Sequence, residues 1–258
     1  MPDTGERRVL HATRIPSLDK VIGGGIVPGS TILILAEPGS GGREFIQTSL
    51  MNYCSDSVKQ VSPPEGVQHP AEIHCISLVC SRDVFEQQIA ELWSTKRDSH
   101  LPKMMESMHY TDLGEEDGED VLTGLFERIN TAPNESILFI DSLTVLLPYC
   151  TRTPDTWVEL VTMMRRVTRS AKKRRTTILF HLTSGILTRG QENELSDTVD
   201  VVLNMFWQKN VTVKRQRQMY LLKLDGRMPR IDQRDMVIFN VNITPGTGFE
   251  ITNMRRVA

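Results

Sequence analysis

The chain has 258 residues, of which 39% are hydrophobic and 24% are charged, a composition that indicates a globular protein and excludes a disordered one. Its formal net charge of −2 excludes a strong general attraction to nucleic acid or to an anionic membrane. No apolar run approaches the ~18 residues that predict a membrane span, and the N-terminal segment lacks the apolar core of a signal peptide. We therefore expect one domain over residues 1–258, in the cytoplasm and with no membrane span.

Helices and buried strands are expected to alternate through most of the chain, because apolar runs alternate with segments of helical periodicity. In chain order the predicted elements are a short helix within 14–29, a strand at 31–35, a helix from about residue 45, a strand at 73–79, a helix from Asp83, a helix from Val121, a strand at 136–142, a helix over 157–171 and a strand at 177–182. Alternation of this kind favours a parallel sheet covered by helices.

Two segments predict surface loops: residues 55–71, which hold three prolines, and residues 95–120, which end in an acidic run. The last quarter of the chain instead shows strand-like runs at 200–207, 211–224 and 236–243, separated by short turns. We interpret these runs as antiparallel additions to the sheet. The predicted fold is therefore α/β, with a mostly parallel twisted sheet flanked by helices and antiparallel C-terminal edge strands.

A glycine-rich turn follows the first predicted strand and precedes a helix, which is the context of a phosphate-binding P-loop. The pattern G-x-x-x-x-G-K-[ST] would place glycine at positions 36 and 41, lysine at 42 and a hydroxyl residue at 43. The chain has Ala36, Gly41, Gly42 and Arg43 there, so it lacks the lysine that reaches the phosphates and the hydroxyl that ligates Mg²⁺. Backbone N–H groups at a helix N-terminus can still attract an anion. The candidate nucleotide-binding residues are Glu37, Pro38, Gly39, Ser40, Gly41, Gly42, Arg43 and Glu44.

Three interpretations of this turn stay open: a nucleotide-binding fold without hydrolysis, a fold that no longer binds nucleotide, and a working ATPase in which Arg43 reaches a phosphate. Asp141 follows four apolar residues at the carboxyl end of a predicted strand, as the Mg²⁺-binding Asp of a Walker B strand does. The alternative for Asp141 is an ordinary turn or helix-capping residue. Together with the glycine turn, the position of Asp141 favours descent from a nucleotide-binding site.

Five segments together resemble the RecA superfamily, and within it the KaiC/RadA-like branch of ATPases. The first three are 15–19 with 23–26, 29–30 together with 37–41, and 141–143; the tail segments 195–202 and 220–226 add support, and the resemblance spans about residues 10 to 252. It implies a RecA-like fold in which ATP or ADP lies between the subunits of a ring or filament. It also implies assembly as a homo-oligomer or with a RecA-like paralogue.

The chain departs from this family at three catalytic elements. Gly42 and Arg43 replace the phosphate-binding lysine and the Mg²⁺-binding threonine, so Mg²⁺ binding is doubtful. The pair of glutamates that activates water corresponds to Arg82 and Asp83, and an arginine cannot act as a general base. The lysine and arginine that face the neighbouring subunit correspond to Lys223 and Asp225, with Arg227 as a candidate to compensate. We therefore predict a degenerate ATPase that acts as a regulatory or assembly module with a protein partner, by analogy in signal transduction.

Three alternatives remain for this prediction: a slow ATPase that uses Arg43 and Asp141, a nucleotide-free scaffold subunit as in the Elongator subassembly, and a recombination accessory protein. Nucleic-acid binding is not favoured, because the segments that bind DNA in RecA-type recombinases, here about 148–155 and 183–196, hold Glu192 and Glu194 as well as Arg152 and Arg189. His181 lies within an apolar run, which predicts a core histidine rather than a ligand.

Overall fold

The computed structural model describes residues 10–59, 69–93, 101–114, 119–208, 215–224 and 236–257. The strands are β1 Thr31–Ala36, β2 Ile73–Ser77, β3 His109–Asp112, β4 Ile137–Asp141, β5 Thr177–Thr183, β6 Val201–Trp207, β7 Arg217–Leu224, β8 Met236–Thr244 and β9 Gly248–Val257. The helices are α1 Pro16–Val21, α2 Gly42–Lys59, α3 Arg82–Trp93, α4 Leu101–Glu106, α5 Glu119–Thr131, α6 Leu147–Cys150, α7 Pro154–Arg174 and α8 Arg189–Thr198, with a 3-10 helix at Leu143–Leu146.

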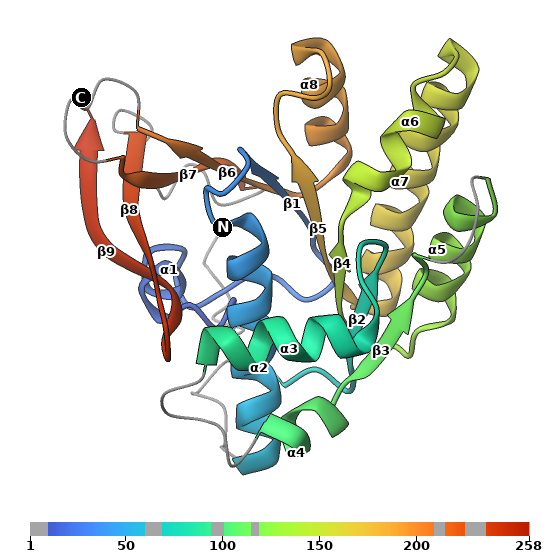
Figure 1. The fold of residues 1–258 in the computed structure, drawn as a ribbon. Coiled ribbons are helices and arrows are strands. Elements are labelled where there is room, and N and C mark those ends of the chain that lie inside the picture. The colour runs from blue at the N-terminus through green and yellow to red at the C-terminus, as the bar shows by residue number, and fades with distance from the viewer. Residues whose placement is uncertain are drawn as a thin grey trace, which may run out of the picture.

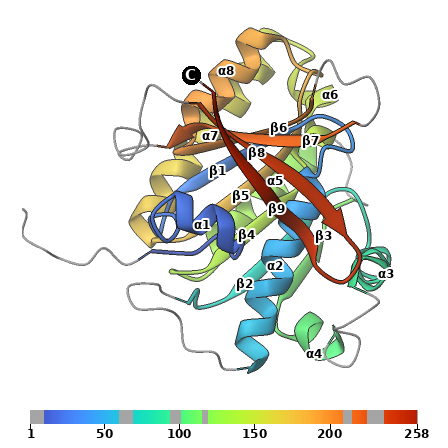
Figure 2. The ribbon, with the colours of Figure 1, turned by 90° about the vertical axis from the view of Figure 1, so that its left-hand side faces the viewer.

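These strands form one nine-stranded sheet in the order β3-β2-β4-β5-β1-β6-β7-β8-β9 (Figures 1 and 2). Each neighbouring pair from β3 to β6 is parallel, and each pair from β6 to β9 is antiparallel. The structure therefore confirms an α/β fold with a mostly parallel sheet, antiparallel C-terminal strands and flanking helices. The expected direction of β6 was wrong: it runs parallel to β1, because α8 carries the chain back before β6 begins.

Helices cover both faces of the parallel part of the sheet (Figure 1). Phe45, Leu50 and Tyr53 of α2 pack in one buried cluster, which also includes Trp93 of α3. A second cluster on the other face joins β4 and β5 to apolar residues of α5 and α7. All six residues of β1 are buried, which explains its continuous apolar run. In the described part of the chain, no helix combines the length and the apolar character that crossing a bilayer requires.

Both predicted surface loops contain regular structure. Helix α2 continues to Lys59, so residues 55–59 are not part of a loop. Residues 101–112 contain α4 and β3, which the sequence pattern did not indicate, because β3 is short and polar and is held in strand form by its pairing with β2. Residues 60–68, 95–100 and 115–118 of the two predicted loops lie outside the described residues, and α5 begins at Glu119, before the expected end of the second loop. Strand β9 was also not predicted, and β2 ends at Ser77 rather than at residue 79.

His11 connects the N-terminal segment to the sheet and makes stability depend on pH. Its buried ring lies 2.8 Å from Oγ1 of Thr177, measured from Nδ1, and its backbone forms a β-bridge with Ile26. Burial, and then the charge of Arg175, lower the pKa of His11 from 6.5 to about 4. The stability that the neutral ring contributes is therefore present above pH 6.5 and is lost as the pH falls towards 4.

We expect the wild type to lose about 2 kcal/mol of unfolding free energy relative to a His11→Asn variant between about pH 7 and pH 5. Asparagine keeps a hydrogen-bonding group near Thr177 but does not titrate, so the difference between the two proteins isolates the imidazole. Urea unfolding at a series of pH values measures it. A difference that is the same at both ends of this range would show that His11 is not the titrating group.

Candidate functional site

The predicted nucleotide loop, residues 37–44, comprises the turn 37–41 after β1 and the first residues of α2, at the carboxyl end of the parallel strands (Figure 1). A tight turn closes where the N–H of Ser40 donates to the carbonyl of Glu37 at 2.9 Å. The carbonyl of Met205 in β6 accepts from the N–H of Glu37 at 2.9 Å and from Oγ of Ser40 at 3.2 Å. Gly39 adopts a φ of 72°, which glycine tolerates without strain. The backbone of Glu37 and the side chain of Ser40 therefore fix the loop to β6.

Two residues far along the chain brace the outer side of this loop. Trp207 donates from its backbone N–H to Oε2 of Glu37 at 2.9 Å and from its indole to the carbonyl of Pro38 at 3.0 Å. Arg217 donates from Nε to the carbonyl of Gly39 at 2.9 Å, and its guanidinium lies 4.7 Å from the centre of the Trp207 ring. These contacts tie the loop to β6 and β7. Neither residue was predicted, because β6 and β7 meet the loop only in the folded chain.

The two glycines at the start of α2 are buried under side chains. A Cβ atom added at Gly41, whose φ is 113°, would lie 3.3 Å from both Ile243 and Phe249. A Cβ atom added at Gly42 would lie 2.5 Å from the Cβ of Ala36 and 2.8 Å from Nε2 of His181. The space that the P-loop lysine side chain would enter from position 42 is therefore filled by Ala36 and His181.

Arg43 and Asp141, which the sequence placed in different motifs, meet in an ion pair. Nε of Arg43 lies 3.0 Å from Oδ2 of Asp141, whose side chain is only 5% exposed. The other oxygen, Oδ1, lies 3.1 Å from Nδ1 of His181. His181 is mostly buried, as expected of a core histidine, but its ring faces this pair, which the sequence interpretation did not foresee. We refer to Arg43, Asp141 and His181 as the carboxylate cluster.

The carboxylate cluster does not fit a Mg²⁺ ion. Each oxygen of Asp141 already has a partner, and the partner on Oδ2 is a cation. A guanidinium carries donors only, so Arg43 cannot serve as a metal ligand beside Asp141. A second cation next to the same carboxylate would be repelled by Arg43. The cluster is thus arranged as a neutralised structural contact and not as a magnesium site.

Arg82 and Asp83, the residues at the predicted position of the glutamate pair, lie exposed in the first turn of α3. Nε of Arg82 is 2.8 Å from Oε1 of Glu86, and its Nη2 donates to the carbonyl of Met105 at 3.2 Å. Within the described ranges, neither residue forms a hydrogen bond or an ion pair with the carboxylate cluster. Glu44 lies in the first turn of α2, where its negative charge interacts favourably with the positive end of the helix dipole.

Lys223, the first of the residues predicted to face a neighbouring subunit, makes bonds within its own chain. Its Nζ donates to the carbonyls of Ser196, Asp197 and Val199, at 3.4, 3.2 and 2.6 Å. A cation at these carbonyls stabilises the C-terminal end of α8. Asp225 and Arg227 lie outside the described residues, so their predicted role stays a prediction.

Comparison with known proteins assigns no family to the chain: no protein-family model matches it, and no curated protein matches it.

Proposed function

We propose that this protein is a RecA-like, KaiC-like module that does not hydrolyse ATP and acts through binding and assembly. The ion pair between Arg43 and Asp141 carries the proposal, because it occupies the carboxylate that Mg²⁺ would need in an active relative. Arg82 adds support, because an arginine that pairs with Glu86 cannot act as the general base expected at position 82. A homo-oligomer or a RecA-like paralogue is the partner that the resemblance implies, and a role in signal transduction rests on analogy.

The alternative of a slow ATPase that uses Arg43 and Asp141 is less well supported. Both groups would have to give up their mutual ion pair to act on a nucleotide and its metal ion. Breaking a buried pair costs several kcal/mol when one partner is left uncompensated. In such an enzyme, the binding of ATP would have to supply the free energy that breaks this ion pair.

A nucleotide-free scaffold is the second candidate, and the packing around Gly42 favours it. The N-terminal turn of α2 would offer its N–H groups to a phosphate, but Gly41 and Gly42 are buried beneath Phe249 and His181. The burial of both glycines leaves their N–H groups little access to a phosphate. Measuring nucleotide binding separately from turnover distinguishes this candidate from the first.

We expect the purified chain to release no phosphate from ATP above the level of an Asp141→Ala variant. Calorimetric titration with ATP and ADP, with and without Mg²⁺, accompanies the turnover assay. Nucleotide binding that does not depend on Mg²⁺ supports a module that binds ATP or ADP without hydrolysis. The absence of binding at millimolar nucleotide supports the nucleotide-free scaffold. Turnover that requires Mg²⁺, is abolished by Asp141→Ala and survives a control Asp155→Ala on the exposed start of α7 would contradict both.

A further inference from the structure

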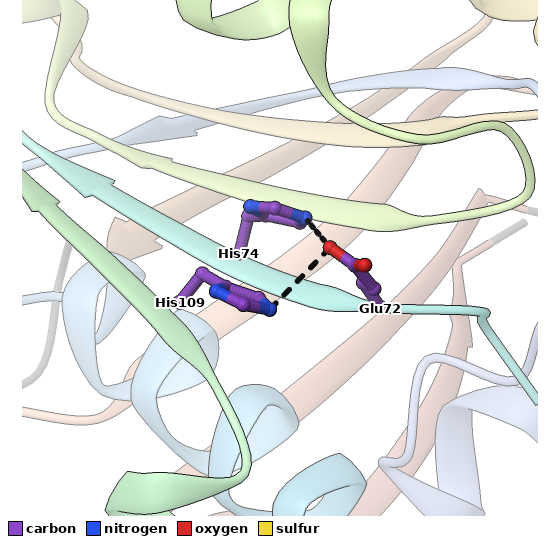
Figure 3. Close-up of side chains that lie close together, drawn as sticks. All are labelled: Glu72, His74 and His109. Carbon is purple, nitrogen blue, oxygen red and sulfur yellow. Dashed lines mark hydrogen bonds and ion pairs between the residues drawn. The ribbon is translucent and has the colours of Figure 1, made fainter.

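Three side chains of the types that ligate metal ions meet at the edge of the sheet (Figure 3). His74 of β2 and His109 of the edge strand β3 are direct neighbours in the parallel register. Glu72 stands two residues before His74, so the period of a strand puts both side chains on one face. All three side chains converge there (Figure 3). The pairing of β2 with β3 is therefore what assembles this group.

The distances suit a single small ion. Oε2 of Glu72 lies 2.9 Å from Nε2 of His74 and 3.4 Å from Nε2 of His109. All three ligand atoms lie within 4.8 Å of one another. Bonds of ~2.0–2.2 Å to a tetrahedral Zn²⁺ place its ligand atoms ~3.3 Å apart. The two distances from Glu72 lie on either side of this value, and the two stacked imidazoles must turn their ring nitrogens toward each other to share one ion.

The burial of the three side chains is graded in the way that an open metal site requires. The side chain of His74 is 17% exposed, that of Glu72 is 38% exposed and that of His109 is 64% exposed. The two rings stack with their centres 4.8 Å apart, which holds His109 beside the better-buried His74. The exposed side leaves room for water ligands.

We propose that Glu72, His74 and His109 bind one divalent transition-metal ion, with Zn²⁺ as the best match for two imidazoles and one carboxylate. Water completes the coordination on the solvent side. The site is independent of the proposed function, because it lies at the start of β2, whereas Asp141 lies at the carboxyl end of β4. In the register of these strands His74 pairs with Leu138, and Asp141 pairs with Ser77.

The test uses the full chain, purified without a histidine tag and stripped of metal by a chelator. Titration with Zn²⁺ against a chromophoric competitor is expected to give one site per chain. Glu72→Gln and His109→Ala are each expected to weaken Zn²⁺ binding at least about 100-fold, the upper range known for loss of a supporting residue alone. Co²⁺ in place of Zn²⁺ should give a visible spectrum of low coordination number, which both variants lose.

Thr111→Ala is the matched control, since Thr111 lies on the same face of β3 as His109 but outside the group. It should bind Zn²⁺ like the wild type. Thermal unfolding without metal checks that the variants still fold, and added Zn²⁺ should raise the melting temperature of the wild type and the control only. Wild-type affinity weaker than about 100 µM, or equal affinity in all four proteins, would overturn the proposal.

Discussion

Replacing Gly42 by alanine is expected to lower the free energy of unfolding by about 3 kcal/mol, at the upper end of the range for an overpacked core. The added methyl group would meet the Cβ of Ala36 at 2.5 Å and Nε2 of His181 at 2.8 Å. Ala36 belongs to a strand that pairs with neighbours on both sides, so its backbone cannot withdraw. His181 is held by Asp141. The clash therefore cannot be relieved by a single rotamer change.

Ala36→Gly should rescue part of this loss. By itself it should cost about 1 kcal/mol, because glycine weakens a strand interior. In the Gly42→Ala background it removes the closest clash, so the double variant should be more stable than the sum of the two changes predicts. In the P-loop pattern, too, only one of these two positions carries a side chain: glycine stands at position 36 and lysine at position 42. A lysine at position 42 is expected to be tolerated only after Ala36→Gly.

Urea unfolding of the two single variants and the double variant measures this coupling. Gly190→Ala on α8 is the control, because the nearest atom to an added Cβ there is 4.0 Å away. It should be neutral or slightly stabilising, since alanine favours a helix. Additive losses in the double variant would show that Ala36 and Gly42 do not share the space between them.

Arg43→Ala is expected to cost about 3 kcal/mol of unfolding free energy, because it leaves the buried carboxylate of Asp141 without its cation. The side chain of Asp141 is 5% exposed, so water cannot replace the lost partner easily. Adding Asp141→Asn should recover a large part of the loss, since the amide carries no charge to leave unpaired. A double-mutant cycle in urea gives the coupling energy between the two residues.

Arg82→Ala provides the comparison for Arg43→Ala. Its ion pair with Glu86 is exposed and spans one helical turn, and such pairs contribute about 0.5 kcal/mol or less. The two arginine variants should therefore differ clearly in stability. If Arg43→Ala is as stable as Arg82→Ala, Asp141 is not held by Arg43 in solution, and the main support for the proposed function is lost.

Much of the fold follows from local patterns in the sequence. Apolar runs at 31–35 and 177–182 predicted buried strands, because a strand buried on both faces carries hydrophobic side chains at every position. Helical periodicity after the glycine turn predicted α2, whose residues Phe45 and Leu50 are fully buried. The sequence also placed Asp141 at the end of a strand, where the structure has it, and a turn after β1. The turn is shorter than predicted, because α2 begins at Gly42 rather than near residue 45.

Other features were decided only by contacts between distant segments. Strand β3 is polar and short, and it is a strand because β2 pairs with it; that pairing alone puts His109 beside His74. His181 read as a core residue because periodicity reports burial but not which neighbours a side chain meets. Its contact with Asp141 depends on the adjacency of β4 and β5, and the contact of Trp207 with the glycine turn depends on the adjacency of β1 and β6. Strand order and register are properties of the whole sheet, so no local window of the sequence contains them.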